Sequence, residues 1–276
     1  MEKLSKTSLN YVLSEYLNDL KRSGVQDFQR APRVNTDRRV SSAASQQTPS
    51  PQPTRGRATI SGESSVSRAV PSPTVSSSAI VGGSGDSRVA ELRLIADQVA
   101  GCSRCAELVA NRTQTVFGVG DPHAELVFIG EGPGAEEDLR GEPFVGRSGK
   151  LLTDMIEKGM RVPRSSVFIC NIVRCRPPGN RNPTSEEAAA CRPFLDATLK
   201  VVAPKYICCL GSIAATNLLG VQSSLGQLRG VVHSYGDAKV VCTYHPAYLL
   251  RNPSAKKDAW LDLQLLMTEM GLPRQG

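Results

Sequence analysis

Residues 86–276 alternate between short apolar segments and segments with helical periodicity, and this pattern restricts the fold to one class. The apolar segments predict strands at 125–129, 166–173, 205–210 and 239–243. The periodic segments predict helices at 89–99, 148–158, 184–202, 212–219 and 256–270. Strands separated by helices at this spacing predict an α/β fold with three layers, α/β/α, and a mostly parallel central sheet. In such sheets ligands bind at the carboxyl ends of the strands.

The first 85 residues differ in composition from the rest of the chain. Residues 31–85 hold 13 Ser, 6 Pro and no aromatic residue, too little apolar surface to offset the entropy of ordering them. We therefore expect a disordered linker over 31–85 and a folded domain over 86–276. Within residues 1–30, apolar side chains at helical spacing predict a short amphipathic helix over 8–21. It is either a docking peptide for a partner protein or a marginal helix without a role.

The net charge of +7 is concentrated in the same segment, with +5 in residues 1–85 and +2 in residues 86–276. Nucleic-acid binding by the domain would therefore use a local patch, and the basic tail either adds a salt-sensitive term or only keeps the chain soluble. The sequence has no apolar run of membrane-spanning length and no secretory signal. We expect a cytoplasmic protein of a bacterial cell, acting at the nucleoid, whose eight cysteines are not disulfides.

Four cysteines form two pairs with the spacing of metal ligands. Cys102 and Cys105 are a C-x2-C pair, and Cys175 and Cys191 are a C-x15-C pair. Four thiolates in two pairs suit tetrahedral Zn or a cubane iron–sulfur cluster, and the spacing alone leaves both open beside a purely structural role. The remaining cysteines lie in apolar predicted strands and are expected in the core: Cys170, Cys208, Cys209 and Cys242.

A glycine-rich turn over residues 130–134 follows the first predicted strand. It is not a dinucleotide fingerprint, because Glu136, Glu137 and Asp138 follow at once and would repel a pyrophosphate. It is not a P-loop either, since no G-x4-G-K-[ST] pattern occurs there. The turn instead offers backbone N–H groups to the carbonyls of a neutral heteroaromatic ring. Phe144 is a candidate to stack on such a ring, although alone it would be taken for a core residue.

The segments GEGPGAEED, GEPFVGRSGKLL, NIVRCRPPGNRNPTSEEAAAC and HPAYLLR, with the upstream C-x2-C, resemble family 4 uracil-DNA glycosylases. These are the iron–sulfur members of their superfamily. The resemblance covers residues 90–272 and leaves the first 85 residues outside it. Gly132 departs from the family, which more often has Ala there. The basic KRRRIH insertion of the branch that bonds covalently to uracil is absent.

The resemblance implies an enzyme that hydrolyses the N-glycosidic bond of deoxyuridine in DNA and leaves an abasic site. It implies that uracil lies against the turn at Gly130, Glu131 and Gly132 and stacks on Phe144. Asn171 would read the Watson–Crick edge of the base, and His245 would donate a hydrogen bond to O2, where charge develops. It also implies one 4Fe–4S cluster with a structural role, on Cys102, Cys105, Cys175 and Cys191.

Two further roles stay hypotheses. The well-known members place a water-activating Asp where this chain has Gly132, so Glu131 and Glu137 are the nearby candidates and a dissociative route is expected. For DNA, Leu249 or Leu250 is a candidate wedge in the base stack. Phosphate contacts are expected from the nearby arginines, unless they are merely solvated: Arg176, Arg181 and Arg251.

Two alternatives compete with this interpretation. One is a non-catalytic zinc module that binds nucleic acid within a replication or repair complex. The other is a glycosylase of the same fold that acts on a different base. Under the favoured interpretation we expect a monomer that binds uracil-containing DNA.

Overall fold

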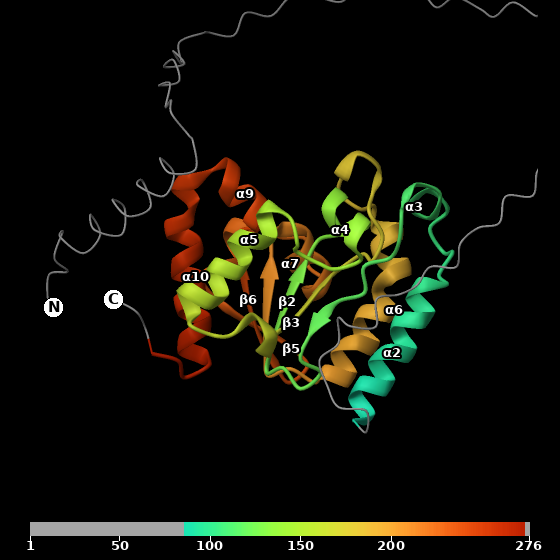
Figure 1. Cartoon of the computed structure of the whole chain (residues 1–276). Helices are drawn as coiled ribbons and strands as arrows, with labels where there is room; N and C mark the ends of the chain where they lie inside the picture. The colour runs from blue at the N-terminus through green and yellow to red at the C-terminus, as the bar shows by residue number, and fades with distance from the viewer. Residues whose placement is uncertain (1–85, 274–276) are drawn as a thin grey trace, which may run out of the picture. The chain divides into compact units, whose positions relative to one another are not determined.

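Six strands form one sheet in the computed structural model, which describes residues 86–273 (Figure 1). Their order across the sheet is β1-β3-β2-β4-β6-β5. The four inner strands are parallel, and the edge strands β1 and β5 pair antiparallel. The strands are β1 (Val119–Gly120), β2 (Leu126–Gly130), β3 (Phe168–Asn171), β4 (Tyr206–Leu210), β5 (Val232–Tyr235) and β6 (Ala238–Thr243). The predicted mostly parallel α/β sheet is therefore confirmed.

Helices cover both faces of this sheet. In chain order they are α2 (Ser87–Ala100), α3 (Ala106–Asn111), α4 (Ala135–Arg140), α5 (Arg147–Asp154), α6 (Ser185–Val202), α7 (Ser212–Leu219), α8 (Leu225–Leu228), α9 (Pro246–Arg251) and α10 (Lys256–Glu269). A π-helical turn, Met155–Met160, continues α5. Short 3₁₀ turns occur at Arg164–Ser166, Pro178–Asn180 and Pro253–Ala255.

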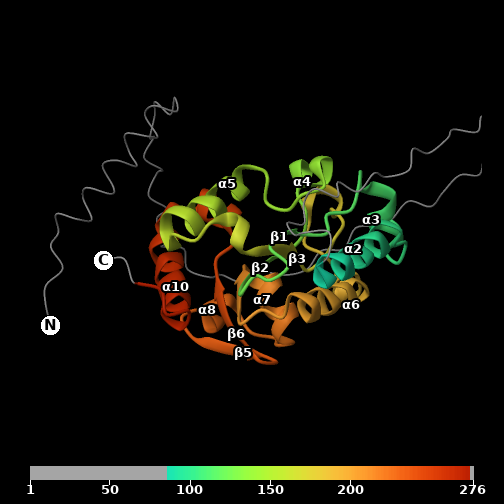
Figure 2. The ribbon, with the colours of Figure 1, turned by 60° about the horizontal axis from the view of Figure 1, so that its bottom comes forward.

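The alternation of side chains along each inner strand divides the core in two. Val127 and Ile129 of β2 pack with α2, α6 and α7, whereas Leu126 and Phe128 pack with α5 and α10. Figure 2 shows α2 and α6 side by side on one face and α5 with α10 on the other. Strands buried on both faces explain the continuous apolar runs in the sequence.

The predicted inner strands and long helices are all present, with ends shifted by a few residues. Thr184 and Glu187 make the expected capping box of α6, because Thr184 Oγ1 accepts the Glu187 N–H and Glu187 Oε2 accepts the Thr184 N–H. The short helices α3, α4, α8 and α9 and the two edge strands were not predicted. β5 is half exposed and β1 has only two residues, so neither carries an apolar run.

The expected helix over 8–21 and linker over 31–85 lie outside the described residues. Within residues 86–273, no helix is long and apolar enough to cross a membrane.

Candidate functional site

A cleft of about 370 Å³ opens at the carboxyl ends of the inner strands, within the usual size range of small-molecule sites. It brings together side chains from the turn after β2, the loop before α5, the end of β3 and the start of α9. Among them are most of the residues predicted to bind a base: Glu131, Gly132, Phe144, Asn171 and His245. Arg251 also lines the cleft.

Asn171 ends β3 and points its side chain into a buried position, where it is 2% exposed. Its amide oxygen Oδ1 is buried and has no hydrogen-bond partner among the described residues. A buried acceptor is rarely left unpaired, so this oxygen is available to a ligand. Gly130 lies opposite Asn171 in the sheet register. A Cβ atom on Gly130 would collide with Oδ1 and lie 2.7 Å from Phe144 Cζ, so the glycine keeps this space open.

Phe144 is held in a strained backbone conformation, with φ at +56° in the left-handed region. Arg164 Nη2 stabilises this turn by donating to the carbonyl oxygens of Pro143 and Phe144, at 3.2 and 3.1 Å. Gly149 passes so close that a Cβ atom there would collide with the Phe144 carbonyl. The result places the Phe144 ring at the cleft, with its centroid 5.5 Å from that of His245.

The Glu137 carboxylate is fully occupied by backbone groups. Oε1 accepts the N–H groups of Val145 and Gly146, both at 3.1 Å, and Oε2 accepts the N–H of Gly134 at 3.1 Å. The side chain is buried and ties the turn after β2 to the loop that carries Phe144. This arrangement gives Glu137 a positioning role at the site.

Glu131 also lines the cleft, but no described backbone N–H group bonds to its carboxylate. No described group hydrogen-bonds its side chain, and burial raises its pKa above the usual value. A carboxylate with a raised pKa next to a cleft is suited to accept a proton from water.

His245 caps the N-terminus of α9. Its Nδ1 accepts the Ala247 N–H at 3.1 Å, so in the neutral ring the proton must be on Nε2. Burial, together with the positive charge of Arg251, lowers the pKa of His245 to about 4. The imidazole is therefore neutral at pH 7 and presents Nε2–H as a donor. Gly211, with φ at +92°, passes close to the histidine Cβ and leaves room for it.

The two leucines considered as DNA wedges differ in exposure. Leu249 is 1% exposed and packs against Ala255 and Ala259, so it belongs to the core. Leu250 is 43% exposed. Adjacent residues of a helix point about 100° apart, and here this turns Leu249 inward and Leu250 toward solvent.

The three predicted phosphate-binding arginines also have different surroundings. Arg181 pairs with Glu187 through two hydrogen bonds of 2.7 and 2.8 Å and with Glu107 at 3.0 Å, joining α3 to α6. Its charge is compensated within the protein. Arg176 Nε donates to Asn180 Oδ1 at 2.7 Å, and Arg251 is exposed beside the cleft.

The sequence did not single out several residues that line the cleft. Ser148, Asn180 and Asn182 contribute polar groups, and Tyr248 contributes an aromatic ring. All four fall within the segments that carry the family resemblance, which was the one available signal.

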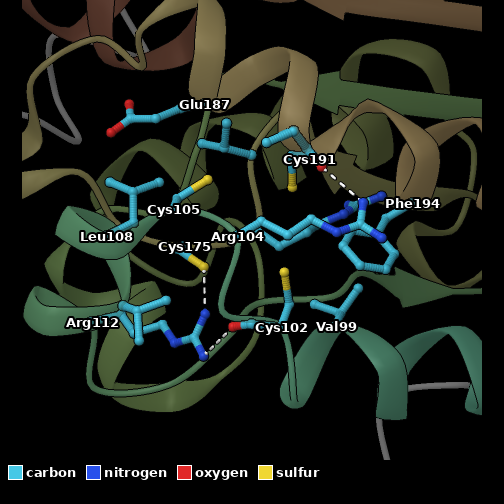
Figure 3. A pocket seen from close by; sticks show the side chains of 14 residues that line it. Val99, Cys102, Arg104, Cys105, Leu108, Arg112, Cys175, Glu187, Cys191 and Phe194 are labelled. Carbon is cyan, nitrogen blue, oxygen red and sulfur yellow. Dashed lines mark hydrogen bonds between the residues drawn. The ribbon is translucent and has the colours of Figure 1, made fainter.

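A second, more enclosed cavity is surrounded by the four paired cysteines (Figure 3). Cys102 follows α2, Cys105 caps α3, Cys175 follows β3 and Cys191 lies in α6, and their sulfur atoms point toward one another. The other four cysteines are buried within β3, β4 and β6, as predicted from their apolar surroundings.

The surroundings of this cavity fit a negatively charged group. Arg112 Nη1 donates to Cys175 Sγ at 3.0 Å, and its Nη2 donates to the Cys102 carbonyl at 2.9 Å. Burial raises the pKa of Cys191 to about 11, so this thiol is neutral unless a metal takes its proton.

The surroundings of Arg174 give the strongest support for a negatively charged group in this cavity. It is 1% exposed, its Nε has no partner, and no described carboxylate pairs with it. Nη1 donates to the Phe117 carbonyl at 2.6 Å, Nη2 donates to the Thr198 hydroxyl at 3.5 Å, and the guanidinium lies 5.5 Å from the Phe117 ring centroid, so these partners are all neutral. A buried cation without a counter-charge costs several kcal/mol, and thiolates at the adjacent Cys175 and at Cys191 would supply that charge.

Within residues 86–273, no group of three or more His, Cys, Asp or Glu side chains is arranged to hold a single metal ion. Tetrahedral Zn requires four ligand atoms converging on one point at about 2.0–2.3 Å. The four sulfur atoms line one cavity and point toward one another, so all four thiols face the same space (Figure 3).

Residues 117–264 match the family model described as the uracil DNA glycosylase superfamily. A type-4 uracil-DNA glycosylase of Thermotoga maritima is 46% identical over 166 residues, covering 59% of this chain and 85% of the relative. One of Sulfurisphaera tokodaii is 41% identical over 174 residues, covering 60% and 79%. A type-5 enzyme of Pyrobaculum aerophilum is 28% identical over 185 residues, covering 55% and 81%. The chain therefore belongs to the type-4 branch of the uracil-DNA glycosylase superfamily.

Proposed function

We propose that the protein is a uracil-DNA glycosylase of base excision repair, which hydrolyses the bond between uracil and deoxyribose and leaves an abasic site. Beyond membership of the family, one observation carries the proposal. The unpaired buried oxygen of Asn171 and the neutral Nε2–H donor of His245 line the same cleft as Phe144. An acceptor, a donor and an aromatic face are the groups that bind a pyrimidine.

Asn171 supplies selectivity for uracil. Its Oδ1 accepts the N3–H of uracil and its Nδ2 donates to O4. Cytosine carries an acceptor at N3 and a donor at the exocyclic amine, so both contacts would fail and the amide would stay buried and unpaired. Phe144 supports the ring by stacking, and Gly130 gives the base room.

His245 stabilises the leaving group. When the bond between C1′ and N1 breaks, its electron pair passes to uracil and negative charge gathers on O2. The Nε2–H of His245 donates to that oxygen, a contact worth about 3 kcal/mol in a desolvated site. A neutral imidazole keeps this donor without a prior proton-transfer step.

Glu131 completes the hydrolysis. A water oxygen forms the new bond to C1′, and its proton passes to the Glu131 carboxylate, whose raised pKa suits that task. Glu137 takes no proton in this scheme, because both its oxygens hold backbone N–H groups.

For DNA, we propose that Leu250 enters the base stack and that Arg251 and Arg176 contact phosphates. Leu249 and Arg181 are left out of this set, because one is in the core and the other is paired with two carboxylates. Flipping the base costs a few kcal/mol, which these contacts must offset.

We further propose that Cys102, Cys105, Cys175 and Cys191 hold one 4Fe–4S cluster. The support is four thiols around one cavity and the buried Arg174 beside it, for which no carboxylate partner is described. When bound, the cluster would supply four iron–sulfur bonds that brace the segments around it. Cys175 lies four residues after Asn171, so the brace ends beside the site.

We also propose that the protein acts in the cytoplasm, where its DNA substrate lies, and that it acts as a monomer. The segment over 8–21, outside the described residues, is proposed to dock on a partner protein.

A test of the function uses oligonucleotides that contain one uracil, single-stranded or paired with guanine or adenine. The purified protein should leave abasic sites that alkali cleaves, and oligonucleotides with thymine should stay intact. His245→Ala should lower the single-turnover rate by about 10²–10³. A colourless zinc protein that releases no uracil would instead establish the non-catalytic alternative, and release of another base alone would establish the second alternative.

A further inference from the structure

Tyr248 is an exposed aromatic residue at the mouth of the cleft. It lies in α9, lines the cleft with Ala247 and Arg251, and is 39% exposed. Leu250 does not line the cleft, because two residues further along a helix lie on nearly the opposite side. Of these two exposed residues, Tyr248 is therefore the one beside a base bound in the cleft, and Leu250 lies outside it.

The ring of Tyr248 is held by a stack beneath it. The Tyr244 and Tyr248 rings are stacked, with centroids 5.0 Å apart and planes inclined by 20°. The Arg229 guanidinium lies 4.6 Å from the centroid of Tyr244. Tyr244 therefore contacts both Arg229 and Tyr248. Among the described residues, Tyr244 is the ring that stacks on Tyr248, which is 39% exposed.

The base of the stack is fixed by ion pairs. Arg229 Nε donates to Asp262 Oδ2 at 3.0 Å, and Arg229 Nη1 lies 3.6 Å from Asp258 Oδ2. Asp262 is buried and also accepts the Thr243 hydroxyl at 2.8 Å. Tyr248 is thus an aromatic surface supported from α10 through Arg229 and Tyr244, with little side-chain freedom left to lose on binding.

We propose that Tyr248 forms a stacking subsite for the nucleobase adjacent to the excised uracil in the DNA strand. This inference rests on the proposed function. Extraction of one base leaves the bases on both sides of the gap without a stacking partner. Leu250 would fill the gap beside one of them, and the Tyr248 ring at the mouth of the cleft would stack on the other. Stacking accepts any base, because every base has a π-face, so the subsite favours no sequence.

The test removes each partner of the contact in turn. Oligonucleotides carry uracil with either the 5′ or the 3′ neighbour replaced by an abasic spacer, and their dissociation constants are measured with wild type and Tyr248→Ala. For one of the two spacers, wild type should lose roughly ten-fold in affinity. Tyr248→Ala should lose the same factor on intact DNA and nothing further on that spacer. Tyr248→Phe should lose affinity on the spacer as wild type does. Tyr248→Leu, which is apolar but not aromatic, should not.

Free uracil separates stacking from an indirect effect on the cleft. Its inhibition constant should be equal for wild type and Tyr248→Ala, since the subsite holds a different base. Equal affinity of wild type and Tyr248→Ala for intact DNA, or a spacer penalty that persists in Tyr248→Ala, would overturn the inference. Failure of wild type to release uracil from any oligonucleotide would overturn the proposed function instead.

Discussion

At the scale of single residues, Glu131 and His245 should control the pH dependence of the single-turnover rate in different pH ranges. Burial raises the pKa of Glu131 and lowers the pKa of His245 to about 4, so Glu131 protonates first as the pH falls from 7. The single-turnover rate should therefore fall with the protonation of Glu131. Glu131→Gln should lower the plateau and move the remaining acid limb down toward about pH 4. An acid limb at the same pH in both proteins would rule out Glu131 as the proton acceptor.

Arg174 provides a second test at this scale, through stability. If its charge is balanced by a cluster, the stabilisation that iron loading gives should be smaller in Arg174→Met than in wild type. Urea unfolding of the iron-free and iron-loaded forms measures this difference. Arg104→Met is a matched control, because Arg104 lines the same cavity but is exposed. Equal stabilisation of wild type and Arg174→Met by iron would show that the charge of Arg174 is balanced otherwise.

At the scale of elements, the inner strands and long helices were readable from the sequence because burial on both faces leaves long apolar runs. The edge strands and short helices carry no such signal. Asn171, His245 and Phe144 were found through motifs of a known family, and from spacing alone each had a plainer explanation. The placements of Leu249 and Arg181 were not readable, since they depend on how α9 packs against α10 at Ala259 and on the contact of Arg181 with Glu107, which is distant in the sequence.

At the scale of the whole molecule, His245 should make folding stability depend on pH. An unfolded histidine binds its proton near pH 6.5, and the folded one does so at about 4. Between these values the unfolded state binds more protons, so stability should fall as the pH falls, by up to about 3 kcal/mol. Urea unfolding of wild type and His245→Gln should show that wild type loses stability relative to the variant by this amount as the pH falls across this range. A constant difference between the two proteins would contradict the lowered pKa.

The Glu137 carboxylate also affects the width of the cleft. A single side chain bonds to Gly134 in the turn after β2 and to Val145 and Gly146 in the loop that carries Phe144. Its length therefore fixes the separation of these two segments beside the cleft. A planar base can enter between two segments of fixed separation only if its thickness and outline fit. This steric requirement precedes any hydrogen bond to the base. The cleft would therefore select a base first by its shape and then by its hydrogen bonds to the amide of Asn171.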